Sequence, residues 1–353
     1  MPFEIDFLTV GDGNGDAICV RYGNPLSGYT THLVDGGFSG TSKTIIEHIE
    51  KYYDTSLIDN VVLSHADNDH AMGLIDVFEH FDIGALWMNR PWLYASEVLD
   101  QFHGGYTLQG LVDRMKELHP YLVEMEQIAE RKEILIYPAF QGSTIGEFQV
   151  LAPTRDRYVS LIHELDKTPT SYAEEATKSI GRIITDAVKA AKDWVLETWG
   201  TETLGDNLST SASNESCIVQ IANFEGNKVV LTADVGPIGL AEAADYAQTL
   251  GLLSPPRFIQ VPHHGSRHNV SKTTLNRWLG MPVPDETTKR GNAFVSIGTK
   301  KSDYPRRAVS NAFLRRGYPV YPTRTGSVRH SQDMPSRNWG AATAEPFHAQ
   351  VEE

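Results

Sequence analysis

The sequence of 353 residues contains only two cysteines, Cys19 and Cys217, and each lies in an apolar stretch. Two such cysteines do not form the disulfide framework of a small secreted protein, and a chain of this length can bury a sufficient core without one. No charged and then apolar leader precedes residues 2–5, as a secretory signal would require. We therefore expect a cytoplasmic protein.

Long apolar runs are also missing. No stretch approaches the roughly 20 consecutive apolar residues that a membrane helix needs. The mean hydropathy of -0.30 is that of a chain rich in polar residues. We therefore expect no membrane partner.

Basic residues are outnumbered by acidic ones, and the net charge of -14 argues against a polyanionic substrate. Their distribution qualifies this argument, because residues 257–329 hold 14 of the 31 lysines and arginines but only three acids. These basic side chains form either a solvated face or a local basic surface on an acidic body. The sequence leaves both interpretations open.

Apolar periodicity predicts an α/β protein. Residues 3–10 and 17–22 alternate like paired strands around the glycine-rich turn 11–16, and residues 58–63 form a short buried strand. Strand and helix patterns then alternate, except in residues 155–213, where roughly 171–198 predict a polar helix. We expect a single domain over residues 1–353, with this helical insertion and a short tail over about 330–353.

Four potential metal ligands directly follow the buried strand 58–63. His65, Asp67, Asp69 and His70 offer imidazole and carboxylate groups within six residues, and backbone-held groups of this kind make a divalent-metal site. The alternative is a polar helix cap in which Asp69 binds backbone N–H groups. A cap explains one aspartate but not four such residues, so the loop favours a metal site.

Further motifs extend this pattern. Asp234 ends one predicted strand, and the pair at 263–264 ends another. With the hairpin and Leu33-Val34-Asp35-Gly36-Gly37, this order resembles the metallo-β-lactamase superfamily. Residues 140–146, 214–216, 296–298 and 321–326 are more narrowly similar to the hydrolase domain of the ComEC competence family. Over residues 3–329, without the insertion, the resemblance implies a metal-dependent hydrolase with a four-layer αββα sandwich.

The resemblance also implies a ligand set of six residues, which the family would use for one or two divalent ions. The first ion would be held by His65 and Asp67, the second by Asp69, His70 and His263, and Asp234 would bridge them. Asp67 stands where the superfamily usually has histidine, and residues 151–154 lack its usual third histidine. Carboxylate in place of imidazole shifts the preference from Zn²⁺ towards Mn²⁺, Fe²⁺ or Mg²⁺.

The expected reaction uses a metal-activated water as nucleophile. Asp69 or Asp67 would orient this water, and His264 would contact the leaving group or give it a proton. Asp35 is either a partner that fixes a histidine tautomer or a turn residue. Ser266 either contacts substrate or caps the next helix, and Asn214 is a further candidate substrate contact.

The ComEC resemblance implies hydrolysis of a phosphodiester, with a nucleic acid or nucleotide as substrate. The expected binding rim consists of Lys300, Lys301, Arg306 and Arg324, together with Arg307. One alternative is a hydrolase of a small phosphoester, cyclic nucleotide or lactone. Another is a catalytically degenerate module that binds a protein partner through the helical insertion. The sequence does not indicate an oligomeric state.

Overall fold

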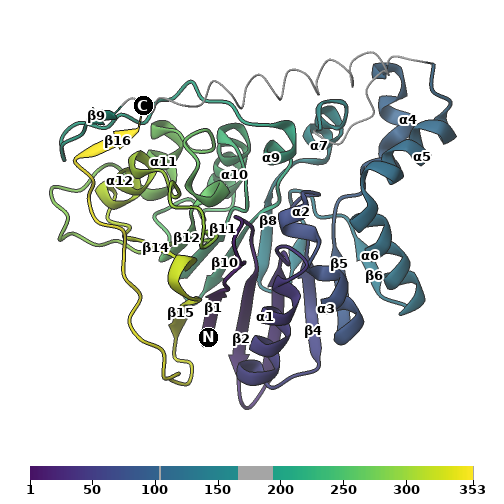
Figure 1. Cartoon of the computed structure of the whole chain (residues 1–353), viewed down its shortest axis with the longest axis horizontal. Helices are drawn as coiled ribbons and strands as arrows, with labels where there is room; N and C mark the ends of the chain where they lie inside the picture. The colour runs from purple at the N-terminus through teal and green to yellow at the C-terminus, as the bar shows by residue number, and fades with distance from the viewer. Residues whose placement is uncertain (103–104, 166–193, 353) are drawn as a thin grey trace.

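The structure is a computed structural model that describes residues 1–102, 105–165 and 194–352. Within these ranges the chain forms two seven-stranded sheets and one two-stranded sheet. The two large sheets lie in the middle of the molecule, with helices outside them (Figure 1).

The first sheet begins with the predicted N-terminal hairpin, which is confirmed. Phe3 pairs with Tyr22 and Phe7 with Ile18 in antiparallel register. Pairing is antiparallel from β15 to β3 and parallel from β3 to β6. In spatial order the strands are β15 (Val328–Gln332), β1 (Phe3–Phe7), β2 (Ile18–Asn24), β3 (Gly28–Val34), β4 (Leu57–Val62), β5 (Asp82–Trp87) and β6 (Leu135–Tyr137).

The second sheet has the same mixed character. Pairing is parallel from β14 to β11 and antiparallel from β11 to β7. In spatial order the strands are β14 (Val320–Pro322), β13 (Asn292–Val295), β12 (Phe258–Gln260), β11 (Asn227–Leu231), β10 (Val219–Phe224), β8 (Phe148–Ala152) and β7 (Thr144–Ile145).

The helices follow the strands in chain order. The α-helices are α1 (Thr41–His48), α2 (Asn68–Ala71), α3 (Leu74–His80), α4 (Ala95–Val98), α5 (Leu108–Leu118), α6 (Pro120–Arg131), α7 (Arg155–Leu161), α9 (Ala212–Glu215), α10 (Pro237–Thr249), α11 (Lys272–Leu279) and α12 (Arg307–Arg315). A π-helical turn continues α1 (Ile49–Tyr53), and 3₁₀ turns occupy Pro91–Tyr94, Leu99–Gln101, Ile162–Glu164, Pro262–Gly265 and Thr323–Thr325.

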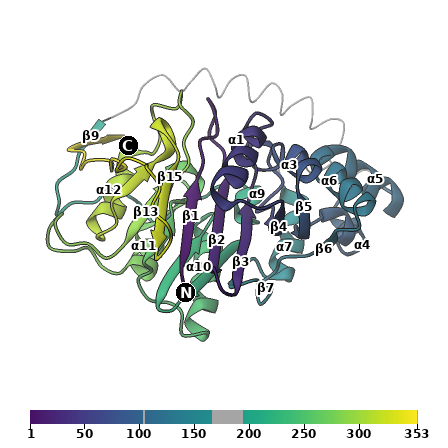
Figure 2. The ribbon, with the colours of Figure 1, turned by 90° about the horizontal axis from the view of Figure 1, so that it is seen from below.

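Three hydrophobic cores separate four layers. Alternate residues of one strand face different cores, as the period of two requires: Leu33 of β3 packs under the helices, and Val34 packs between the sheets. The core between the sheets contains the rings of Phe7 and Phe258, 5.8 Å apart. The third core joins the second sheet to α10–α12. Helices α1 and α3 therefore lie opposite α10 and α11 (Figure 2), which confirms the αββα sandwich.

The loops after β3, β4, β11 and β12 bring the candidate ligands together. Strands β3 and β4 are parallel, as are β11 and β12, so each pair ends at one sheet edge. Two glycines allow the first two loops to touch. A Cβ atom on Gly73 would lie 2.0 Å from the carbonyl oxygen of Gly36, so any larger residue would push these loops apart.

The predicted insertion is described only in part. Residues 166–193, which hold most of the helix expected over 171–198, lie outside the described residues. The end of that prediction is wrong, because Trp194–Leu196 forms strand β9, antiparallel to β16 (Gln350–Glu352). The expected tail starts inside β15 and ends in β16. The assignment of one domain over residues 1–353 stays a prediction.

Two expectations from composition can be compared with the structure. Cys19 and Cys217 are buried and free, so neither takes part in a disulfide. In the described ranges, no helix combines the length and apolar character needed to cross a bilayer.

Candidate metal centre

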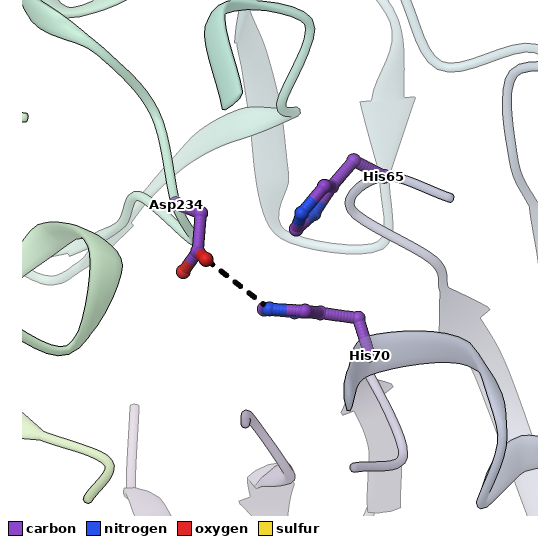
Figure 3. Close-up of side chains that lie close together, drawn as sticks. All are labelled: His65, His70 and Asp234. Carbon is purple, nitrogen blue, oxygen red and sulfur yellow. Dashed lines mark ion pairs between the residues drawn. The ribbon is translucent and has the colours of Figure 1, made fainter. Parts of the chain in front are cut away.

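His65, His70 and Asp234 converge from both sheets, although they are far apart in the sequence. Each offers a ligand atom within 4.8 Å of the others, and all three residues are buried. Nε2 of His70 lies 3.4 Å from Oδ2 of Asp234. Figure 3 shows the three side chains pointing towards one another, with the dashed line marking this pair.

The helix-cap alternative named Asp69, but Asp69 lies inside α2 and not at its N-cap. Asp67 occupies the N-cap position of α2, yet its side chain makes no capping hydrogen bond. Its Oδ2 instead lies 3.5 Å from Nε2 of His65. This places Asp67 beside His65, as expected for the first metal position, although no ligand group found among the described residues includes it.

His264, rather than His263, completes a second ligand group with Asp69 and His70. Its Nδ1 donates to the carbonyl oxygen of Ser296 at 2.9 Å, so its Nε2 is the nitrogen left for a metal. That Nε2 lies 3.8 Å from Oδ2 of Asp69 and 3.6 Å from Oδ2 of Asp234. No ligand group found in the described part of the chain includes His263, although its Nδ1 lies 3.4 Å from Oδ2 of Asp234, so its assignment as a ligand stays a prediction.

The conformation of the turn after β12 explains why His264, and not His263, lies in this ligand group. His263 and His264 have φ values of 46° and 55°, in the left-handed region that non-glycine residues rarely adopt. Nδ1 of His263 accepts a hydrogen bond from the Asn214 amide at 2.7 Å, and its side chain is 30% exposed. Asn214 thus holds His263 at the edge of the centre, with Nδ1 of His263 3.4 Å from Oδ2 of Asp234.

Asp35 lies behind His70. Its Oδ2 is 2.8 Å from Nδ1 of His70 and 2.6 Å from the Ser64 hydroxyl, and its Oδ1 accepts from the Ser64 backbone N–H at 2.8 Å. Asp35 is fully buried. Of its two sequence interpretations, the partner that fixes a histidine tautomer agrees with these contacts.

Asp16 joins the centre although the sequence analysis assigned it only to a turn. It forms ligand groups with Asp234 and His264, and with Asp35 and His70. An aspartate after a glycine-rich turn is usually a turn residue. The one signal that could have separated Asp16 from its neighbours is its position directly before the buried stretch 17–20.

The charges in the centre strongly influence one another. Burial alone would raise the pKa of Asp234, but the neighbouring histidines outweigh it and hold that pKa well below its usual value. Burial would lower the pKa of His264, yet nearby carboxylates, chiefly Asp234, raise it to about 9. The carboxylates therefore create a negative potential that favours positive charge.

The residues fit a divalent metal ion. Five buried ligand atoms have no hydrogen-bond partner, namely Nε2 of His65, His70 and His264 and Oδ1 of Asp16 and Asp234. Leaving such atoms unsatisfied costs free energy, and coordination to one or two divalent ions would lower this cost. Mixed imidazole and carboxylate donors are ordinary ligands of Zn²⁺, Mn²⁺ and Fe²⁺.

Three of the basic residues predicted to contact substrate already form ion pairs with acidic side chains. Lys300 pairs with Asp12 at 2.8 Å, Arg306 with Asp303 at 3.3 Å, and Arg324 with Glu345 at 3.2 Å, while Lys301 is exposed. Arg315 and Arg316, from the same basic segment, are buried at 1% and 0% exposure. The basic segment is therefore part core and part surface.

Two further contacts place the candidate rim residues. The backbone N–H of Arg306 donates to the carbonyl oxygen of Gly265 at 2.9 Å, directly after the histidine turn. Ser266 lies in the same loop and accepts from the His268 N–H at 3.3 Å. Ser266 does not cap the next helix, because Ser271 holds that position with a capping box.

A comparison with family models finds a similarity that includes the ligand loop. A family model described as the metallo-beta-lactamase superfamily matches residues 20–136, which contain His65, Asp67, Asp69 and His70. The match shows similarity to this superfamily over residues 20–136 of the 353-residue chain.

Several solved structures are similar to the whole chain at low identity. A diphosphatase from the PhnP family is 10% identical (TM-score 0.41), with 94% of this chain and 98% of that chain covered. Zn²⁺-bound PqqB from Methylobacterium extorquens is 11% identical (TM-score 0.42), with 94% and 100% covered. A metal-dependent hydrolase of the beta-lactamase superfamily is 13% identical (TM-score 0.42), with 93% and 98% covered. A search of curated proteins finds no match.

Proposed function

We propose that this protein is a metal-dependent phosphodiesterase. The observation that carries the proposal is the group of five buried ligand atoms without hydrogen-bond partners, contributed by both sheets. A divalent ion bound there would lower the pKa of a coordinated water and polarise the scissile bond. The phosphodiester specificity, the ComEC resemblance and a nucleic acid or nucleotide substrate are parts of this proposal.

Residues around the centre would orient the metal ligands, the attacking water and the leaving oxygen. Asp35 keeps His70 in the tautomer whose Nε2 carries a lone pair. Asp69 and Asp67 are 28% and 30% exposed and would orient the attacking water. Because Asn214 donates to Nδ1 of His263, the proton of a neutral His263 ring sits on Nε2. A neutral ring can donate a hydrogen bond from Nε2 but cannot act as the acid, so we assign His263 a hydrogen bond to the leaving oxygen, a contact that the sequence had given to His264. The leaving oxygen would take its proton from solvent.

The rim suggests how a phosphate would be held. Lys300 is 75% exposed even in its ion pair, and Arg306 is 24% exposed beside the histidine turn. Both could exchange a carboxylate for a phosphate oxygen, which also accepts charge-assisted hydrogen bonds. Because these basic side chains already have acidic partners, a small phosphoester or cyclic nucleotide is the second candidate substrate.

The test is a substrate panel on chelated protein reconstituted with Mn²⁺ or Zn²⁺. The panel contains bis-p-nitrophenyl phosphate, p-nitrophenyl phosphate, labelled single- and double-stranded DNA, RNA, a cyclic dinucleotide and a lactone. We expect metal-dependent cleavage of phosphodiesters, and loss of both cleavage and bound metal in Asp234→Asn. Cleavage of the lactone alone would reject the phosphodiesterase. Wild-type protein that binds no divalent ion would favour the partner-binding module.

A further inference from the structure

Asp16 contributes one of the five unpartnered ligand atoms, but the roles proposed above for individual residues do not include it. Its exposure is 1%, and its Oδ2 accepts a hydrogen bond from Nε2 of Gln260 at 2.9 Å. Its Oδ1 is buried and has no hydrogen-bond partner. Burying a carboxylate oxygen in this way is costly unless a positive charge or a donor compensates for it.

The Gln260 amide can face Asp16 in only one orientation. Its Oε1 accepts from the backbone N–H groups of Thr232 and Ala233, both at 2.9 Å. Its Nε2 must therefore point to Asp16, since an amide nitrogen only donates. Gln260 thus ties Asp16 to the turn that carries Asp234.

The ligand loop holds Asp16 from the other side. The N–H of Asp16 donates to the carbonyl oxygen of Asp69 at 3.3 Å, and a Cβ atom on Gly15 would lie only 2.5 Å from that oxygen. With the backbone and Oδ2 fixed, the position of Oδ1 is also fixed. A ligand atom of Asp16 lies within 4.8 Å of ligand atoms of Asp234 and His264.

We propose that Asp16 is a further metal ligand and that it sets the preference of the centre for a hard ion. This inference rests on the proposed metal-dependent function. With Asp16, the carboxylates in these ligand groups include Asp16, Asp69 and Asp234. The imidazoles come from His70 and His264. Carboxylate-rich sites suit Mn²⁺ and Mg²⁺, whereas imidazole suits Zn²⁺. Asp16 should therefore favour Mn²⁺ relative to Zn²⁺.

The test compares Asp16→Asn with the control Asp12→Asn. Asp12 lies in the same turn, but its side chain is 63% exposed and pairs with Lys300. Metal-free proteins are titrated calorimetrically with Mn²⁺ and with Zn²⁺. We expect the Mn²⁺ Kd of Asp16→Asn to rise by at least about tenfold, as for other altered metal surroundings, with a smaller change for Zn²⁺. Asp12→Asn should keep both wild-type values.

Thermal melting separates a ligand from a structural carboxylate. The metal-free Tm of each protein serves as its own baseline, because Asp16 helps to raise the pKa of His264 and its charge is therefore partly compensated before metal binds. If Asp16 is a ligand, the rise in Tm on adding Mn²⁺ should shrink in Asp16→Asn, because this rise depends on Kd. A lower metal-free Tm with an unchanged Mn²⁺ increment would overturn the inference and leave Asp16 as a partner of Gln260.

Two other results would decide the matter. An unchanged Mn²⁺ Kd in Asp16→Asn, or equal losses for both ions, would reject Asp16 as the determinant of metal preference while the hydrolase proposal stands. Wild-type protein that binds neither ion would reject both proposals. If Asp16→Asn does not fold, wild-type crystals soaked in Mn²⁺ give the answer, since anomalous scattering should place the ion within roughly 2.5 Å of Oδ1 of Asp16.

Discussion

Asp35 accepts a hydrogen bond from Nδ1 of His70 across 2.8 Å, and neither side chain is exposed to solvent. The Ser64 N–H and hydroxyl donate to the same carboxylate. With Nδ1 acting as the donor, Nε2 of His70 presents its lone pair towards Asp234. A carboxylate outside the ligand set thus prepares one of the ligands.

The variant Asp35→Asn should weaken metal binding without removing a ligand. The amide loses the negative charge and offers an N–H where the carboxylate only accepts. We expect the metal Kd to rise by about 10- to 100-fold, the range found when such supporting residues are changed. Calorimetric titration of metal-free protein measures this. Asp76→Asn is the matched control, because Asp76 accepts from the Ser42 hydroxyl at 2.8 Å, away from the centre.

Gly15→Ala should damage the same centre through the backbone. The new Cβ would lie 2.5 Å from the carbonyl oxygen of Asp69, so the ligand loop must shift. We expect lower metal content, measured by elemental analysis, and a lower Tm. Gly40→Ala is the control, because a Cβ atom there would meet no atom within 4 Å. Equal metal content in the two variants would show that the turn does not position the ligand loop.

Local patterns in the sequence predicted an α/β chain and most of the candidate ligands, and the family resemblance implied the αββα sandwich. Alternation in residues 3–10 identifies a strand, and a strand followed by His65, Asp67, Asp69 and His70 identifies a ligand loop. The choice between His263 and His264 depends instead on two left-handed residues in succession. Because both residues are histidine, any preference for that conformation is the same at the two positions and could not separate them.

Other features depended on partners far away in the sequence. Asp16 is buried because Gln260, 244 positions later, donates to it. Trp194–Leu196 becomes a strand because β16 pairs with it from the other end of the chain. Arg315 is fully buried and contacts Glu197 at 3.0 Å, so counting basic residues overstated the surface charge of its segment. None of these contacts leaves a periodic signal.

His32 should make stability depend on pH. It is fully buried against Phe148, with ring centroids 4.6 Å apart, and burial lowers its pKa to about 3. In the unfolded chain it takes up a proton below about pH 6.5. The folded protein binds that proton only near pH 3, so the contribution to stability is complete above pH 6.5 and falls as the pH decreases. The loss between pH 7 and pH 5 should be roughly 2 kcal/mol.

Urea unfolding of wild type and His32→Leu, both with chelator, measures this effect. Leucine stays uncharged, so the free energy of unfolding should fall less steeply with decreasing pH in the variant. The difference between the two proteins cancels the titration of the candidate metal centre, which both retain. Parallel pH profiles would show that His32 does not titrate differently on folding.

The basic rim predicts a salt-dependent substrate affinity. The variant neutralises three rim residues, Lys300, Lys301 and Arg306. Arg307 is left unchanged, because its guanidinium packs over the Trp194 ring at 4.7 Å and supports the pairing of β9 with β16. If the three side chains contact phosphates, their replacement by glutamine should raise KM for a DNA substrate several-fold without changing metal content. Each lost phosphate contact should also flatten the plot of log K against log salt by about 0.7 to 0.9.

A second triple variant separates local contacts from net charge. This control replaces Lys43, Lys51 and Arg131 by glutamine. All three are exposed and lie on helices that cover the first sheet. The net charge changes by the same amount as in the rim variant. If net charge alone attracts the substrate, both variants should show the same shallower slope. If the rim binds phosphate, only the Lys300, Lys301 and Arg306 variant should do so. An unchanged KM and slope in both would favour a small phosphoester, because the existing partners Asp12 and Asp303 would then keep these cations occupied.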